Sequence, residues 1–275
     1  IRGYGKYSTP AGLVGHIGRN YLFDRRSRKN PDAETPRRFG QGLKSLGIRA
    51  RKGGCPDRWA AARAGVAAFG RNNFAISPEL GSWINVETWL LDAELPPDEP
   101  TLSAPCPQNC DACVKACPTG AITGPHEMRI DRCVAFLTYG DCGEIDPELA
   151  AQMGGWIYGC DRCQEVCPLN EGKLRESEPA PWLEGAADLL RPEALAEMDE
   201  RTYREVVHPL FWYIPDDAGG LERWRRNARR ALLNAGCGMG DGRRAKSVRG
   251  RPAVHFVHRV HLATGRDHST LEPEN

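Results

Sequence analysis

The stretch of sequence that decides the fold is residues 106–118, CPQNCDACVKACP, and its second half is echoed at residues 160–168, CDRCQEVCP. The chain holds 11 cysteines, and nine of them lie between Cys106 and Cys167. Disulfide frameworks are typical of small secreted domains whose cysteines are spread along the chain. Clustered cysteines without a signal-peptide pattern favour a metal site in a reducing cytoplasm instead.

The spacing of these cysteines predicts iron–sulfur clusters. Bacterial two-cluster ferredoxins carry the run C-x2-C-x2-C-x3-C-P, in which the fourth cysteine ligates the other 4Fe–4S cluster. The proline that follows has no N–H to compete for hydrogen bonds. Structural zinc sites also use pairs of C-x2-C, but they have no reason to repeat the C-x3-C-P ending. Two 4Fe–4S clusters are therefore predicted, zinc is the alternative, and the chain is expected to transfer single electrons.

The two runs assign seven of the eight cluster ligands. Cluster one is assigned four cysteines: Cys106, Cys110, Cys113 and Cys167. Cluster two is assigned three: Cys117, Cys160 and Cys163. The remaining thiolate comes from Cys133 or Cys142. Three residues separate Cys106 from Cys110 where the ferredoxin pattern has two, so this loop is expected to bulge.

Longer stretches around these cysteines resemble the epoxyqueuosine reductases, enzymes of tRNA queuosine biosynthesis with the reductive dehalogenases as distant relatives. They read CDACVKACPTGAI (110–122), RCVAFLT (132–138) and YGCDRCQEVCPLN (158–170). Upstream, AARAGVAAFGRN (61–72) and GSW (81–83) are similar to segments near the corrin ring of that family. The resemblance extends over about residues 1–172. It implies that Cys133 is the fourth ligand of cluster two and that Cys142 is a free thiol.

The resemblance implies an α+β fold in three parts. Residues 1–100 would form part of a nitroreductase-like α/β domain of the corrinoid-binding type, N-terminally incomplete relative to the family. Residues 101–172 would form a domain like that of bacterial two-cluster ferredoxins, and residues 173–275 a short helical region with a basic tail. Local patterns predict helices at 34–46, 57–64, 192–207 and 221–234, and strands at 48–50, 73–76 and 82–91. The Gly-, Arg- and His-rich stretch from Gly236 has no periodicity and is predicted to be poorly ordered.

The resemblance also implies a cobalamin beside cluster two. The residues expected to bind it are Gly65, Gly70, Arg71, Asn72 and Ser82. Glycine suits such a site because a side chain would collide with the flat ring. From the local pattern alone, Gly65 is a helix stop and Gly70 belongs to a turn, so both interpretations are kept.

The activity that the resemblance implies is the reduction of epoxyqueuosine in tRNA to queuosine, with electrons passing through both clusters to the cobalamin. The family's proton-donating aspartate falls near Arg51, where the segment RKGGCP (51–56) holds no acid. The catalytic residues are therefore left unassigned. Two alternatives follow: a cofactor-free, ferredoxin-like electron-transfer module serving a partner enzyme, or a reductive dehalogenase-like enzyme with another substrate.

Composition and charge limit the classes of partner that the chain is expected to have. The chain carries 37 Lys and Arg against 36 Asp and Glu, so it lacks the overall basic field of many nucleic-acid binders. No apolar run approaches the roughly 18 residues of a membrane-spanning helix. We expect a cytoplasmic monomer that receives electrons from a ferredoxin or flavodoxin and acts on tRNA. The chain begins at Ile1 without an initiator Met, which is typical of a fragment or a processed product.

Two features of the C-terminal third have competing interpretations. Five arginines are predicted to lie on one helix: Arg223, Arg225, Arg226, Arg229 and Arg230. They would either grip phosphates, with Trp224 stacking on a base, or lie on an amphipathic helix that packs through Trp224. The histidines His255, His258 and His261 have a helical spacing that suits a metal site, but no carboxylate or cysteine lies among them.

Upstream, in the cysteine region, Trp156 and Tyr158 are predicted to shield a cluster from water.

Overall fold

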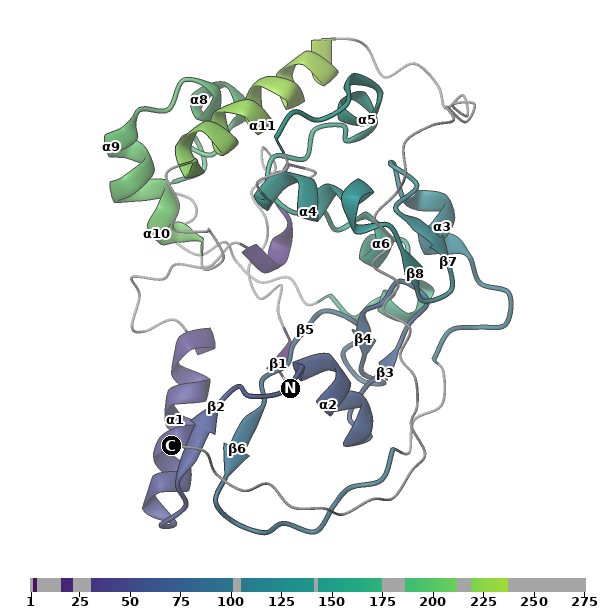
Figure 1. The fold of residues 1–275 in the computed structure, drawn as a ribbon, viewed down its shortest axis with the longest axis vertical. Coiled ribbons are helices and arrows are strands. Elements are labelled where there is room, and N and C mark those ends of the chain that lie inside the picture. Colours follow the sequence, from purple (N-terminus) through teal and green to yellow (C-terminus); the bar gives the residue numbers. More distant parts are fainter. Residues whose placement is uncertain are drawn as a thin grey trace, which may run out of the picture. The chain divides into compact units, whose positions relative to one another are not determined.

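The computed structural model describes residues 2–3, 16–21, 31–100, 105–140, 143–174, 186–211 and 219–236. The chain divides into two compact units, residues 1–244 and 245–275, and every described residue lies in the first. Figure 1 shows the helices and strands of this unit. Several positions considered above lie outside the described residues, namely Cys142, His255, His258 and His261.

The upstream part of the unit combines helices with short strands (Figure 1). In chain order its elements are β1 (Arg2–Gly3), η2 (Arg19–Tyr21), α1 (Pro31–Ser45), β2 (Ala50–Lys52), α2 (Asp57–Arg63), β3 (Ala68–Phe69), β4 (Ala75–Ile76), β5 (Ile84–Asn85) and β6 (Trp89–Leu91). The strands pair antiparallel as β1–β5, β2–β6 and β3–β4. The helices predicted from Glu34 and from Asp57 are confirmed, as is a strand near 73–76.

The predicted strand over 82–91 is divided into β5 and β6, and Thr88 explains the break. Its backbone N–H and its hydroxyl both donate to the Asp57 carboxylate, at 3.0 and 2.7 Å. These bonds tie the connection to the start of α2, while the Thr88 carbonyl oxygen accepts from the Gly53 N–H just beyond β2, at 2.8 Å. The helix α2 ends at Arg63, and Gly65, just beyond its C-cap Ala64, has a φ of +63°, a backbone conformation that glycine adopts readily. The local interpretation of Gly65 as a helix stop is thus confirmed.

The cysteine region consists of short helices, turns and one small hairpin. Its elements are α3 (Ala112–Ala116), β7 (Ile122–Gly124), β8 (Glu127–Met128), η3 (Ile130–Arg132), α4 (Val134–Tyr139), α5 (Pro147–Gln152), α6 (Arg162–Glu165) and η4 (Pro168–Asn170). The strands β7 and β8 pair antiparallel, and α3 packs against α6. These two helices lie in the two cysteine runs, so the sequence echo has a structural counterpart.

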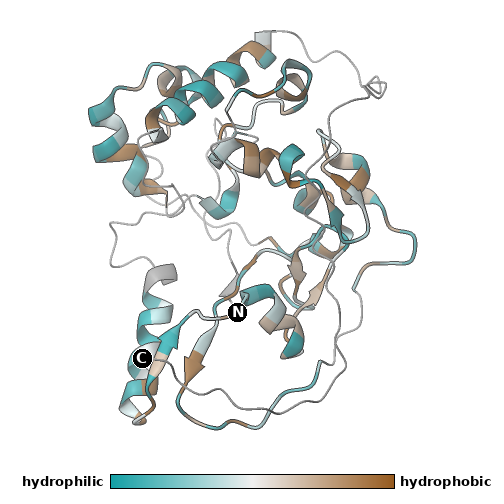
Figure 2. Cartoon of the chain, in the orientation of Figure 1, coloured by the Kyte–Doolittle hydropathy of each residue, from teal (hydrophilic) through white to brown (hydrophobic). Residues whose placement is uncertain are grey.

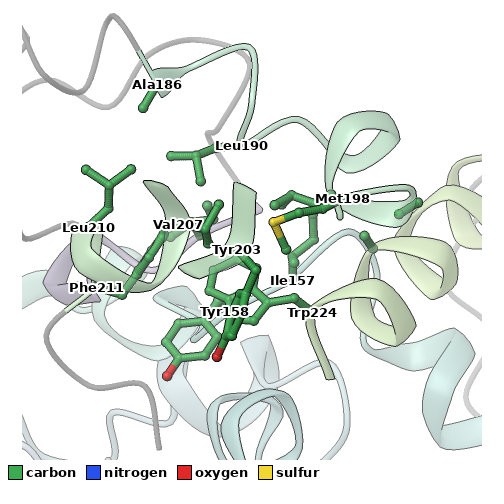
Figure 3. Close-up of a cluster of buried hydrophobic side chains, with 14 of the residues drawn as sticks. Ile157, Tyr158, Ala186, Leu190, Met198, Tyr203, Val207, Leu210, Phe211 and Trp224 are labelled. Atoms are coloured by element: carbon green, nitrogen blue, oxygen red, sulfur yellow. The ribbon is translucent and has the colours of Figure 1, made fainter. Parts of the chain in front are cut away.

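The C-terminal part packs on the cysteine region through the largest buried hydrophobic cluster among the described residues (Figure 3). Its elements are α8 (Pro192–Ala196), α9 (Glu200–Thr202), the π-helical turn η5 (Tyr203–Val207), α10 (His208–Leu210) and α11 (Gly220–Gly236). The cluster joins side chains from this part to Ile17, Ile157 and Tyr158. A parallel bridge between Ile17 and Tyr158 ties residues 16–21 to the same place.

The single helix predicted over 192–207 is wrong, because the chain breaks it at Asp199. That carboxylate accepts a hydrogen bond from the Thr202 N–H at 2.6 Å and so begins a new helix. The helix predicted over 221–234 is confirmed as α11. In Figure 2, α11 carries both hydrophilic and hydrophobic residues. Trp224 and Ala228 of α11 are buried, as an amphipathic helix requires.

The described residues form a mixed fold of helices and short strands, so the mixed class is confirmed. Within them, the strands pair as two-stranded sheets. None of the described helices is long and apolar enough to cross a membrane.

Candidate metal centre

The fold gathers eight cysteines into two sets of four. In the first set, Cys113 interacts electrostatically with Cys106 and Cys167, and Cys167 interacts with Cys106 and Cys110. In the second set, Cys133 interacts with Cys117, and both Cys160 and Cys163 interact with Cys117 and Cys133. The cysteine–cysteine interactions found for these five cysteines all lie within one set. We call them set one (Cys106, Cys110, Cys113, Cys167) and set two (Cys117, Cys133, Cys160, Cys163). All eight are free of disulfides.

Burial makes five of these eight thiols poor acids in the absence of a cation. It raises the pKa of Cys113 and Cys167 in set one, and the pKa of Cys133 and Cys163 in set two. It raises the pKa of Cys160 to about 12. A thiolate is the metal ligand, so buried thiols of this kind need a bound cation to lose their protons. Four iron ions per set would supply that charge.

The sulfurs also have the hydrogen-bond donors that a cluster site needs. The Ala121 N–H donates to the Cys117 sulfur at 3.2 Å, and the Arg71 N–H donates to the Cys106 sulfur at 3.3 Å. Among the described residues, no three His, Cys, Asp or Glu side chains are placed to hold a single metal ion. The four cysteines of each set and the N–H groups that donate to their sulfurs fit iron–sulfur clusters.

The long spacing between Cys106 and Cys110 is accommodated by a turn. The Cys110 N–H donates to the Pro107 carbonyl oxygen at 3.1 Å, and Asn109 adopts a φ of +60°. Asparagine is among the few residues that tolerate this left-handed conformation. The extra residue is taken up in this turn, so Cys106 remains close to the other members of set one. The expected bulge is confirmed.

An apolar wall closes set two on one side. Val134, Leu137, Met153 and Trp156 form a buried cluster, and Cys160 packs against it. Trp156 thus lies where it can keep water from this set, as predicted. Tyr158 packs in the larger C-terminal cluster instead. A low dielectric on one side of a cluster is one of the means by which a protein sets its reduction potential.

Three of the five residues expected to bind cobalamin are bonded to the cysteine region. The Arg71 guanidinium donates to the Cys110 carbonyl oxygen at 3.0 Å, and the Asn72 amide donates to the Cys163 carbonyl oxygen at 3.1 Å. The buried Ser82 hydroxyl donates to the Gln164 side chain at 2.9 Å and accepts from the Asn170 amide at 2.8 Å. The sequence analysis missed Gln164 and Asn170, because nothing in their local pattern pairs them with Ser82.

Gly65 and Gly70, the two glycines expected to bind cobalamin, have structural roles. Gly65 follows the end of α2 and turns the chain, as described above. Gly70 is buried, and a Cβ atom built on it would lie 2.5 Å from Ile76 Cδ1 and 2.9 Å from Asn72 Oδ1. The space beside Gly70 is therefore filled by the protein's own side chains.

The helix α11 caps the carbonyl groups of the segment between Cys133 and Cys160. Asn227 Nδ2 donates to the carbonyl oxygens of Thr138 and Ile157, at 2.7 and 3.0 Å. Arg226 donates to Leu137 O at 3.2 Å and to Gly143 O at 3.0 Å. Further along the helix, Arg230 donates to Trp156 and Gly154, and Asn234 to Ala150 and Gly154. Sequence reasoning missed this capping role entirely.

These contacts bear on the two interpretations of the arginine helix. Arg226 and Arg230 are bonded to carbonyl groups, and Arg225 donates to Met198 O at 2.9 Å. Burial lowers the pKa of Arg230 to about 10. Arginines engaged in this way hold the fold together, so the packed amphipathic helix is the interpretation that the structure supports.

Comparison with known families identifies the class of the cysteine region. Residues 106–170 match the family described as a 4Fe-4S double cluster binding domain. The chain is therefore a double-cluster iron–sulfur protein, and the prediction of two 4Fe–4S clusters is confirmed.

Individual relatives identify the family more closely. The chain is 35% identical over 182 residues to an epoxyqueuosine reductase of Bacillus subtilis, covering 65% of this chain and 44% of that protein. It is 39% identical over 180 residues to that of Staphylococcus aureus, covering 65% of this chain and 45% of that protein. The chain thus spans less than half of the length of these two relatives.

Solved structures agree with these relatives. An epoxyqueuosine reductase in complex with a tRNA-Tyr epoxyqueuosine-modified stem loop matches with a TM-score of 0.64 and 27% identity, over 85% of this chain and 63% of that one. The enzyme of Streptococcus thermophilus matches with a TM-score of 0.67 and 26% identity, over 85% and 62%. The chain is therefore related to the epoxyqueuosine reductase family, as its sequence predicts.

Proposed function

We propose that this chain is an oxidoreductase of the epoxyqueuosine reductase type, which reduces epoxyqueuosine in tRNA to queuosine. The observation that carries the proposal is the pair of four-cysteine sets within a region that matches a double-cluster domain. The reaction takes two electrons and two protons per epoxide, forms the alkene and releases the epoxide oxygen as water. Single-electron carriers in series suit such a two-electron reduction.

We assign set one to one 4Fe–4S cluster and set two to the other. When bound, the two clusters supply one-electron transfer. The chain's own residues hold the thiolates in place, donate N–H groups to the Cys106 and Cys117 sulfurs, and exclude water from set two through Trp156. The hydrogen bonds and the apolar wall favour a buried cluster whose potential depends on this chain's residues.

Cobalamin and a nitroreductase-like, corrinoid-binding upstream domain belong to the same proposal, supported by the relationship to the epoxyqueuosine reductases. The side chains of Arg71, Asn72 and Ser82 each make a hydrogen bond within the protein, so a part of their bonding capacity is already used there. The proposed electron path is supported by the structure as far as set two.

A second function is favoured by the residue at the proton-donor position. Arg51 lies in β2, is exposed and pairs with Leu90 of β6. The resemblance implies that the family's proton-donating aspartate corresponds to a position near Arg51, and the segment 51–56 holds no acid. An electron-transfer module that serves a partner enzyme would not need the acid. This module is the second candidate.

The partners follow from the same relationship. The substrate is a tRNA that carries epoxyqueuosine, and the electron donor is a small protein such as a ferredoxin or flavodoxin. We infer a monomer in the cytoplasm; the cytoplasmic location is supported by the free cysteines of the two sets, which suit a reducing compartment.

Anaerobic purification tests the iron–sulfur part first. About eight irons and eight acid-labile sulfides per chain are expected, with paramagnetic reduced clusters. About one zinc per chain without labile sulfide would overturn the assignment.

The enzyme and the module are then distinguished by two measurements on the same preparation. A chemical reductant, hydroxocobalamin and an epoxyqueuosine-bearing tRNA stem loop are added, and the nucleosides are analysed for queuosine. Saturable visible-absorption changes with hydroxocobalamin, together with queuosine formation, support the enzyme. Full clusters with neither response would support the module.

A further inference from the structure

The turn between β3 and β4 contacts both cysteine sets. This turn, residues 70–74, is closed by hydrogen bonds from Gly70 N to Phe74 O at 2.8 Å and from Asn73 N to Gly70 O at 2.9 Å. Its two central side chains reach in different directions. Arg71 bonds to set one and Asn72 bonds to set two.

Arg71 joins both ends of the unusual three-residue connection in set one. Its backbone N–H donates to the Cys106 sulfur at 3.3 Å, and its guanidinium donates to the Cys110 carbonyl oxygen at 3.0 Å. Its own carbonyl oxygen accepts from the His126 N–H at 3.1 Å, so the Arg71 backbone is held in turn. One residue therefore fixes the distance between two members of set one.

This connection needs such support more than a two-residue one would. The turn at 107–110 places Asn109 at a positive φ, a conformation that costs conformational energy even for asparagine. The turn itself closes with one hydrogen bond, from Cys110 N to Pro107 O. The guanidinium bond to Cys110 adds a second restraint from outside the loop.

Asn72 performs the matching task for set two. Its side chain is 4% exposed, and its Nδ2 donates to the Cys163 carbonyl oxygen at 3.1 Å. Its Oδ1 accepts from the Phe74 N–H at 3.2 Å, so the amide orientation is fixed by the turn. A buried amide with both ends engaged is a rigid link between the turn and the second cysteine run.

We propose that the turn 70–74 is a positioning element that holds the cysteine loops of both sets in place. It acts through Arg71 for set one and through Asn72 for set two. The inference rests on the proposed assignment of a cluster to each set. It gives these residues a task in cluster retention that is separate from any contact with a corrin ring or a substrate. Arg71 and Asn72 act through the cysteine loops and are not catalytic residues.

The test measures which cysteines lose iron first. Anaerobic holoprotein is treated with a ferrous chelator, samples are alkylated at intervals, and the modified cysteines are identified by peptide mass spectrometry. Arg71→Met should expose set one about 2- to 12-fold faster than wild type, the range that one lost hydrogen bond of ordinary strength predicts. Asn72→Asp keeps the oxygen that Phe74 uses and removes the donor to Cys163, so it should expose set two faster by a similar factor.

Two further variants separate positioning from general destabilisation. Arg71→Lys keeps one side-chain N–H donor and should restore part of the wild-type rate for set one. Arg63→Met changes an exposed arginine on α2, whose ring contact is to Trp59, and should leave both rates unchanged. A general loss of stability would speed the alkylation of both sets together and would not be rescued by Lys.

The outcomes distinguish this inference from the proposed function. Wild-type protein without iron and sulfide would refute the cluster assignment itself. Wild-type protein with both clusters, but with Arg71→Met and Asn72→Asp either at wild-type rates or accelerated equally in both sets, would refute the positioning role alone. Should Asn72→Asp yield no folded protein, the Arg71→Met and Arg71→Lys pair decides the matter for set one.

Discussion

Trp224 stacks on Tyr158, with ring centroids 4.8 Å apart and ring planes 7° from parallel. Trp224 also lies against Phe211 at 4.7 Å, and only 1% of its surface is exposed. Figure 3 shows these rings within the C-terminal cluster. The stacked pair joins α11 to the segment that leads into Cys160. The indole has no open face for a nucleic-acid base, so the base-stacking interpretation of Trp224 is wrong.

Trp224→Ala should therefore act on stability. Removing a buried indole leaves a cavity, and such changes cost about 3–5 kcal/mol of unfolding free energy. Urea denaturation of the holoprotein, followed by circular dichroism, measures the change. Leu233→Ala on the same helix is the control, because Leu233 is 69% exposed and should shift stability by less than about 0.5 kcal/mol. Equal effects of the two substitutions would contradict the packing described here.

Asn227→Leu tests the carbonyl capping by α11. Leucine has a similar size but no donors, so the Thr138 and Ile157 carbonyl oxygens lose the bonds from Asn227. Each buried acceptor left unpaired costs about 1–3 kcal/mol. We expect lower stability and earlier iron loss from set two, because both carbonyls lie in the segment between Cys133 and Cys160. Denaturation and iron release measured on one preparation check this, and iron loss first from set one would contradict it.

The cysteine sets were predictable because their ligands follow a local spacing rule. Three of four ligands of set one lie within eight residues, and the rule itself states that the last cysteine of each run crosses to the other cluster. The fourth ligand of set two, Cys133, lies outside both runs. Only the resemblance pointed to it, and the structure places it beside Cys117.

The supports around these sets could not be predicted in this way. Arg71 meets Cys106 across 35 residues, and Asn72 meets Cys163 across 91 residues. The local sequence around Arg71 and Asn72 has no pattern that predicts contacts with such distant residues. For the same reason the carbonyl capping by Asn227, 89 residues from Thr138, was not foreseen. The break at Asp199 was a local signal, and it was overlooked because the surrounding helical pattern is strong.

Cys133→Ala distinguishes the two candidates for the last ligand of set two. Its loss should remove or convert one cluster, so that iron falls from about eight towards about four per chain. Cys142→Ala should keep both clusters, although Cys142 itself lies outside the described residues. Cys55→Ala serves as a control from outside the cysteine region. Iron lost from Cys142→Ala but retained by Cys133→Ala would reverse the assignment.

Asp199 should make the stability of the fold depend on pH, in a direction that follows from its role as the N-cap of α9. The hydrogen bond from the Thr202 N–H holds the pKa of the Asp199 carboxyl below its ordinary value. A lowered pKa in the folded state means that the carboxylate contributes stability above the unfolded pKa of about 3.9. This contribution is lost as the pH falls through the folded pKa.

Asp199→Ala makes that contribution measurable. The difference in melting temperature between wild type and variant should be constant near neutral pH and should shrink at pH values below about 4. Asp199→Asn keeps a capping oxygen but cannot ionise, so it should show no such dependence relative to Asp199→Ala. A difference that grows on acidification would contradict the cap.

Gly70→Ala and Gly42→Ala form a matched pair for the turn that joins the cysteine sets. A Cβ at Gly70 would lie 2.5 Å from Ile76 Cδ1 and 2.9 Å from Asn72 Oδ1, so the added methyl must displace the end of the Ile76 side chain and the Asn72 amide that bonds to Cys163. Overpacking of this kind costs about 1–3 kcal/mol. A Cβ at Gly42, within α1, meets nothing within 4 Å, and alanine there should stabilise the helix by about 0.5–1 kcal/mol. Thermal denaturation should show a lower melting temperature for Gly70→Ala and a higher one for Gly42→Ala. The chelator assay should show faster exposure of set two for Gly70→Ala only. A Gly70→Ala protein with wild-type stability and wild-type iron retention would show that the turn tolerates the methyl group and that its contact with Cys163 does not depend on this glycine.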